Sequence, residues 1–121
     1  IGKVVPSVNG KLQGHAQRVQ VPDGSVTELT TVLNKETTAD EINEAFKAAF
    51  SDTDYYGYND EGIVSSDILG DTHGGVFDPT QTDVNTIDGV TLARTVSFYD
   101  NEYGFTSNMI RTLLYFAEIS E

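Results

Sequence analysis

The stretch of residues 97–105 gathers the side chains of this chain that are best suited to binding chemistry. An aromatic strand end is followed there by Asp100, Asn101 and Glu102, and then by a helical pattern. Each of these side chains can cap a helix by accepting hydrogen bonds from its free backbone N–H groups. An amide such as Asn101 can also hold a ligand, because it donates and accepts at once. Local chemistry alone favours capping, and both uses remain open at this point.

Arg18 is a second candidate for binding, because it falls in the middle of a predicted strand over residues 15–21. Strand side chains point alternately to the two faces of a sheet, so an arginine directed into a cleft has a fixed position. Its planar guanidinium can then hold a phosphate through two hydrogen bonds. Taken alone, such an arginine is more often half of a surface or cross-strand ion pair.

Other patterns of catalytic or metal chemistry are missing from the sequence. The chain has no cysteine, which excludes disulfides, thiolate metal sites and thiol nucleophiles within it. His15 and His73 are its histidines, and neither has a carboxylate at a helical metal-ligand spacing, so we expect no metal site. The Ser-Ser-Asp run at residues 65–67 lacks a nearby histidine base. The glycine pair at residues 74–75 does not open a helix after a strand, as a dinucleotide fingerprint requires. We therefore expect no catalytic residue.

Composition limits the class of protein and its partners. The 121 residues are 38% apolar and carry 7 basic against 19 acidic side chains, a formal charge of −12. One globular domain is expected, and nucleic acid or an anionic membrane surface would be repelled. No apolar run approaches the ~20 residues that span a bilayer, and the first residues lack the apolar stretch of a secretory signal, so a cytoplasmic location is expected. The chain begins with Ile1 rather than methionine, which we interpret as a sign of a processed product or a fragment.

Two β-hairpins are predicted to position the candidate residues. Strands over 15–21 and 25–33 are separated by a Pro-Asp-Gly turn at residues 22–24. Strands over 82–87 and 90–99 are joined by Asp88 and Gly89, a strong two-residue hairpin signal. Residues 63–69 read as a short strand with a polar centre, and residues 55–62 as a loop.

Two helices complete the expected elements. Thr38 and Glu41 have the spacing of a capping box, and the apolar residues behind them lie on one helical stripe that ends at Phe50. We expect this helix to lie across one face of the sheet. A second amphipathic helix is predicted from about Phe105 to Ile119, and its apolar stripe needs a partner surface.

Several unrelated motifs of this chain recur, in order and in spacing, in one enzyme family. They lie at residues 9–14, 18–19, 24–26, 64–67, 71–73, 76–78 and 99–102. On these motifs the whole chain resembles the phosphorylating glyceraldehyde-3-phosphate dehydrogenases of the bacterial kind. The resemblance implies an α+β fold, a mixed and mostly antiparallel sheet with helices on one face. It also implies that residues 1–121 are the C-terminal part of the catalytic domain.

The resemblance assigns roles to four residues. Arg18 matches the arginine that binds the substrate phosphate or inorganic phosphate, and Asn101 matches the asparagine on the nicotinamide carboxamide of NAD. Tyr99 and Glu102 match neighbouring motif residues to which we assign structural support of the site. Phe105 stands where the family usually has a tyrosine, so a hydroxyl near the nicotinamide is missing here.

The family's reaction also needs parts that lie ahead of Ile1 in its members. A cysteine thiolate, a histidine and an N-terminal dinucleotide-binding domain convert glyceraldehyde 3-phosphate, phosphate and NAD to 1,3-bisphosphoglycerate and NADH in glycolysis. We therefore expect the chain alone to be inactive and to bind NAD poorly, although the family is homotetrameric and active. Two alternatives stay open: a stand-alone binding or scaffold module derived from the enzyme, and part of an erythrose-4-phosphate dehydrogenase.

Overall fold

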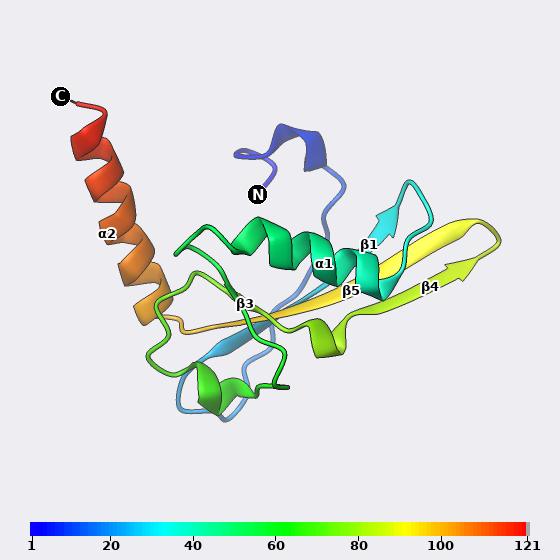
Figure 1. The fold of residues 1–121 in the computed structure, drawn as a ribbon, viewed down its shortest axis with the longest axis horizontal. Coiled ribbons are helices and arrows are strands. Elements are labelled where there is room, and N and C mark those ends of the chain that lie inside the picture. Colours follow the sequence, from blue (N-terminus) through cyan, green and yellow to red (C-terminus); the bar gives the residue numbers. More distant parts are fainter. Residues whose placement is uncertain (121) are drawn as a thin grey trace.

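The computed structural model describes residues 1–120, which form one sheet, two α-helices and three short 3₁₀ helices (Figure 1). In chain order the elements are η1 (Pro6–Val8), β1 (Ser25–Leu33), α1 (Ala39–Phe50), β2 (Gly57–Tyr58), η2 (Ser65–Ile68), β3 (Val76–Phe77), η3 (Pro79–Gln81), β4 (Asp83–Ile87), β5 (Val90–Tyr99) and α2 (Tyr103–Glu118). Within residues 1–120 no helix has both the length and the apolar character needed to cross a membrane.

Strand β5 is the centre of the sheet. Strand β1 runs antiparallel along one edge of β5, from the pair Ser25 and Tyr99 to the pair Leu33 and Thr91. Along the other edge β5 pairs antiparallel first with β4 and then with β3, and β2 adds to β3 in parallel. The predicted α+β class with a mixed, mostly antiparallel sheet is confirmed. In this sheet the start of β1 lies beside the end of β5, next to the candidate residues of the 97–105 stretch.

The hairpin of β4 and β5 is confirmed, with the turn at the predicted residues. Asp88 has a φ of 51° and Gly89 a φ of 78°. Positive φ at both central residues is the geometry of the type I′ turn, whose twist matches that of the flanking strands. The sequence signal worked here because the two turn residues alone determine the conformation.

Helix α1 covers one face of the sheet through aromatic packing. Phe77 is 1% exposed, and its ring stacks on Phe46 of α1 with 4.2 Å between ring centroids. Farther along the helix, Phe50 stacks on Tyr56 at 5.1 Å. The predicted capping box is present, since Thr38 accepts from the Glu41 N–H and Glu41 accepts from the Thr38 N–H. The helix therefore begins and packs as its sequence pattern predicts.

The opposite face carries the main hydrophobic core at the end of β5 that leads to α2. Successive strand residues point to opposite faces, so Val76 lies on the face away from Phe77. It packs with the other buried members of the cluster, which are Ile63, Ile68, Val96 and Phe98. Residues 63–68 thus cover this face of the sheet beside the junction between β5 and α2.

Two predicted strands are wrong. Residues 15–21 form no strand, because they pair with none of the strands of the sheet, and Val19 and Val21 are 67% and 41% exposed. The predicted hairpin at residues 22–24 therefore does not form. Residues 63–69 contain the 3₁₀ helix η2 instead, because the Asp67 carboxylate accepts from the Val64 N–H at 2.8 Å and closes the polar centre into a turn.

Two further boundaries differ from the sequence prediction. The expected loop at residues 55–62 contains the short strand β2, where the Gly57 N–H donates to the Gly75 carbonyl at 2.9 Å. Helix α2 begins at Tyr103, two residues before the predicted start. In Figure 1, α2 extends away from the sheet toward the C-terminus, whereas α1 stays beside it.

Candidate functional site

Asp100 holds together the junction between β5 and α2. Its side chain is 2% exposed, and its carboxylate accepts from the backbone N–H groups of Gly70 at 2.9 Å, Glu102 at 2.9 Å and Tyr103 at 2.6 Å. The N–H donors of Gly70 and Tyr103 are the main reason that the pKa of Asp100 lies below its ordinary value. Of the three adjacent polar residues, Asp100 is therefore the one that caps the helix.

Asn101 is consequently left for another use. Its side chain is exposed, and its Oδ1 accepts from the hydroxyl of Ser25 at 2.9 Å. Ser25 is the first residue of β1 and pairs with Tyr99, so the bond extends the strand ladder by one side-chain contact. In residues 1–120 the Nδ2 group of Asn101 has no hydrogen-bond partner. The oxygen of the Asn101 amide is thus held by Ser25, while its NH₂ group is unpaired within residues 1–120.

Glu102 shares this corner with another carboxyl group. Asp23, in the turn before β1, lies within hydrogen-bonding reach, and this contact raises the pKa of Glu102 above its ordinary value, with burial and the charges of Asp23 and Asp100 adding to the shift. The three carboxylates lie within 4.8 Å of one another. Because the Asp100 oxygens already accept three backbone N–H groups, this proximity does not by itself make a metal site. The prediction of no metal stays a prediction.

A loop against the first turns of α2 is the part of the site that the sequence analysis missed. The His73 carbonyl lies so close to Gly104 that a Cβ at Gly104 would meet it at 2.5 Å. Arg111 donates to the Thr72 carbonyl at 2.8 Å and to the Asn108 amide oxygen at 3.0 Å. The available signal was Gly104 itself, because glycine near a helix start marks a close approach of another backbone.

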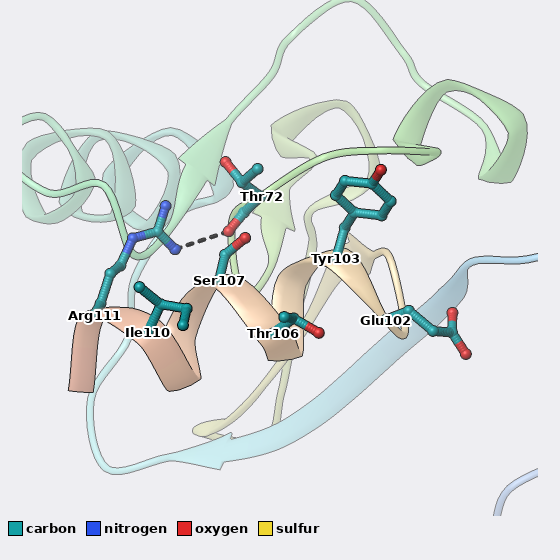
Figure 2. A pocket seen from close by; sticks show the side chains of 7 residues that line it. All are labelled: Thr72, Glu102, Tyr103, Thr106, Ser107, Ile110 and Arg111. Carbon is teal, nitrogen blue, oxygen red and sulfur yellow. Dashed lines mark hydrogen bonds between the residues drawn. The ribbon is translucent and has the colours of Figure 1, made fainter. Parts of the chain in front are cut away.

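Beside this loop a hollow of about 530 Å³ opens along α2. Figure 2 shows its lining side chains, which come from the helix start and from the loop. They are Thr72, Glu102, Tyr103, Thr106, Ser107, Ile110 and Arg111. Of the four residues assigned by resemblance, Glu102 alone lines this hollow. The dashed line in Figure 2 marks the hydrogen bond from Arg111 to the Thr72 carbonyl, two further lining residues.

The four residues assigned by resemblance do not all come together. Tyr99 ends β5, half-buried, one residue before Asp100, and it lies with Asn101 and Glu102 at the junction. Arg18 is exposed in the irregular segment 15–21, and in residues 1–120 no hydrogen bond or ion pair ties it to this junction. The sequence argument that a strand fixes Arg18 is therefore wrong, because that strand is absent.

Comparison with known proteins gives a consistent result. The family model described as glyceraldehyde 3-phosphate dehydrogenase, C-terminal domain, matches residues 1–101. A glyceraldehyde-3-phosphate dehydrogenase of Streptococcus pyogenes is 54% identical over 121 residues, which is all of this chain and 35% of that protein. One of Lactobacillus delbrueckii subsp. bulgaricus is 56% identical over 119 residues, or 98% of this chain and 35% of that protein.

The chain therefore spans about a third of the length of the curated relatives that it matches. The family model covers the sheet, α1 and the junction up to Asn101, which includes Arg18 and Tyr99. The identity to the relatives continues through α2. On this evidence the chain belongs to the family of glyceraldehyde-3-phosphate dehydrogenase C-terminal domains.

Proposed function

We propose that residues 1–121 work as the C-terminal part of the catalytic domain of an NAD-dependent, phosphorylating glyceraldehyde-3-phosphate dehydrogenase. The intact enzyme would oxidise glyceraldehyde 3-phosphate with NAD and phosphate to 1,3-bisphosphoglycerate in glycolysis, in the cytoplasm and as a homotetramer. The chain-long identity of 54% to enzymes of that name supports this. The observation that carries the proposal is the exposed amide of Asn101, released from capping by Asp100 and held by Ser25.

Asn101 fits the nicotinamide carboxamide of NAD. That group carries one carbonyl and one NH₂, and a side-chain amide is complementary to it because it also accepts and donates. The Nδ2 of Asn101 has no partner in residues 1–120, so it can donate to the carboxamide oxygen without breaking an existing bond. NAD, when bound, supplies the acceptor for a hydride. Asn101 would orient the nicotinamide, with Tyr99 and Glu102 supporting the backbone on either side.

Arg18 would bind the phosphate of the substrate or inorganic phosphate. A chain with a formal charge of −12 needs a local cation to attract a dianion. A guanidinium matches phosphate oxygens through paired N–H donors. Arg18 is exposed and belongs to the same N-terminal segment that leads into β1, so its donors are accessible to such an anion.

The chain alone would be inactive and would bind NAD poorly. It contains no cysteine to attack the aldehyde, and the thiolate and histidine of the family's reaction would come from a preceding segment. The apolar stripe of α2 supports a larger protein, since Met109, Leu113 and Phe116 are 53%, 64% and 58% exposed. A stand-alone scaffold module would leave this patch open to solvent, which is costly in a soluble protein.

The test uses the intact enzyme that carries this segment. We expect Arg18→Leu to raise KM for phosphate about 10- to 100-fold, the size of a lost charge-assisted hydrogen bond, and to leave NAD affinity unchanged. Asn101→Ala should weaken NAD binding about three- to ten-fold. Asn101→Asp keeps the acceptor for Ser25 and removes the NH₂, so it should weaken NAD binding at least as much. Lys11→Leu, another cation of the same exposed segment, is the matched control.

An unchanged KM for phosphate in Arg18→Leu, or unchanged NAD binding in both Asn101 variants, would overturn the corresponding role. Glyceraldehyde 3-phosphate and erythrose 4-phosphate are compared as substrates of the wild-type enzyme. A higher kcat/KM for erythrose 4-phosphate would favour the alternative enzyme. The 121-residue chain by itself should give no NADH above a mock preparation.

A further inference from the structure

We propose that Ser25 is a positioning residue for the cofactor, whose hydroxyl holds the side chain of Asn101 in the orientation that receives the nicotinamide carboxamide. This inference rests on the proposed function and adds a residue to its binding site. Ser25 would not touch NAD. It would act through Asn101, across a bond that joins two residues 76 positions apart in the chain.

Asn101 needs such a support because little else restrains it. Its side chain is exposed, and the terminal torsion of an asparagine has broad minima. An asparagine beside a helix start can also turn back and cap it. Here Asp100 already accepts the N–H groups of Glu102 and Tyr103, so that alternative is taken. In residues 1–120 the Ser25 hydroxyl is the one side-chain partner of Asn101.

Ser25 can supply the support because its own backbone is fixed by the fold. It pairs with Tyr99 at the end of the β1–β5 ladder. Immediately before it, Gly24 has a φ of 88° and lies against η2, where a Cβ would be 3.0 Å from Ile68 Cγ2 and 3.2 Å from the Ser65 carbonyl oxygen. The hydroxyl is therefore presented from a packed turn and a paired strand, both of which exist before any cofactor binds.

A side chain held in its bound orientation loses less conformational freedom when the ligand arrives. Removal of the Ser25 hydroxyl should therefore weaken NAD binding without removing a contact to NAD. The hydrogen bond joins neutral groups at an exposed position, so the expected loss of affinity is about three- to ten-fold. The KM for phosphate should stay unchanged, because in residues 1–120 no hydrogen bond or ion pair joins Arg18 to Ser25 or Asn101.

The experiment compares two variants of nearly equal shape in the intact enzyme. Ser25→Thr keeps the hydroxyl, and Ser25→Val replaces it with a methyl group. Both residues suit a strand position. The dissociation constant of NAD is measured by titration calorimetry without substrate, so that the readout is binding and not turnover. Ser51→Ala, which removes a hydroxyl that donates to the Ala48 carbonyl at 3.0 Å in α1, is the control for loss of a hydroxyl elsewhere.

The same pair is then made in an Asn101→Ala background. We expect Ser25→Val to weaken NAD binding about three- to ten-fold, Ser25→Thr to bind like wild type, and Ser25→Val to have no further effect once Asn101 is alanine. Equal binding by Ser25→Val and Ser25→Thr would overturn the inference, and so would an additive effect in the Asn101→Ala background. If Asn101→Ala weakens NAD binding while Ser25→Val does not, the inference fails and the proposed function stands. If both Asn101→Ala and Asn101→Asp bind NAD normally, the inference and the proposed role of Asn101 both fail.

Discussion

Helices α1 and α2 have similar amphipathic patterns and opposite surroundings. In α1 the apolar residues Ile42, Phe46 and Phe50 are half-buried. The rings of Phe46 and Phe50 stack on Phe77 and Tyr56. In α2, within residues 1–120, the contacts to the loop at residues 72–74 come from Gly104, Asn108 and Arg111, and the large apolar side chains are exposed. The exposed residues are Tyr103, Phe105, Met109, Ile110, Leu113, Leu114, Tyr115 and Phe116.

The two helices show what an apolar stripe predicts and what it does not. A stripe predicts that a helix forms and that one side of it seeks an apolar surface. Whether that surface belongs to the same chain is not encoded in the stripe. For α1 the surface is Phe77 and Tyr56, whereas for α2 nothing in residues 1–120 covers it. The α2 helix is instead held by the cap at Asp100 and by the contacts of Gly104 and Arg111 with the loop at residues 72–74.

The largest effect should come from breaking the surface that α1 packs on. Phe77→Ala removes a ring that is 1% exposed and stacked on Phe46, so the free energy of unfolding of the 121-residue chain should fall by about 3–5 kcal/mol. Phe105→Ala on α2 removes a ring that is 71% exposed and should change the free energy of unfolding by less than about 0.5 kcal/mol. Urea unfolding measures both.

Equal losses of stability in Phe77→Ala and Phe105→Ala would show that α2 is covered within this chain. That result would contradict the difference between the two helices. If Phe77→Ala does not fold, Phe77→Leu keeps most of the volume and should still lose more stability than Phe105→Leu. The same two Phe105 variants made in the intact enzyme should destabilise it, because the proposed function requires another segment over α2.

The second prediction breaks the anchor of α2. Gly104→Ala places a Cβ at 2.5 Å from the His73 carbonyl oxygen, a backbone atom that cannot move away cheaply. We expect a loss of about 1–3 kcal/mol, although alanine is the better helix former by about 1 kcal/mol. Gly14→Ala, where a Cβ meets no atom within 4 Å, should be nearly neutral in urea unfolding. Increased stability of Gly104→Ala would mean that the loop at residues 72–74 does not press on α2.

Two features predicted correctly from sequence are ones in which neighbouring residues determine the conformation. The capping box of Thr38 and Glu41 and the turn at Asp88 and Gly89 each need a few adjacent side chains, and both are present. The strand predicted at residues 15–21 failed because a strand needs a partner and burial, which alternation along one segment cannot supply. Its failure also removed the geometric argument for Arg18, whose role now depends on the family alone.

The residues of the candidate site also divide into those that a local pattern predicts and those that it does not. The strand end, the cap and the helix start expected at residues 97–105 are present, because all three are local features. The partners of that junction come from distant segments: Asp23 lies in the turn before β1, Ser25 is the first residue of β1, and Gly70 follows η2. No local pattern predicts that these residues meet, since the sheet pairing of β1 with β5 brings them together.

The smallest predicted effects compare the acidic residues at the two helix starts, and they have opposite signs. The pKa of Glu41 lies below its ordinary value, first because the Thr37 hydroxyl donates to it and then because the Thr38 N–H does. Its contribution to stability is present above the unfolded-state pKa and is lost as pH falls through the folded-state pKa. The pKa of Glu102 is raised, chiefly by its hydrogen bond with Asp23, so its ionisation disfavours folding. That penalty is full above the raised folded-state pKa and disappears as pH falls below the unfolded-state value.

At pH 7 we therefore expect Glu41→Gln to lower the melting temperature of the chain and Glu102→Gln to raise it slightly. Both differences from wild type should shrink as the pH falls through the range in which the two glutamates protonate, since each wild-type side chain then becomes neutral like glutamine. Melting curves from pH 7 downward measure this, with Glu61→Gln, an exposed glutamate outside both helix starts, as the control. A Glu102→Gln variant less stable than wild type at pH 7 would mean that the Asp23 and Glu102 carboxyls do not repel one another. The negative charge of Glu102 would then stabilise the start of α2, in addition to the cap formed by the buried Asp100.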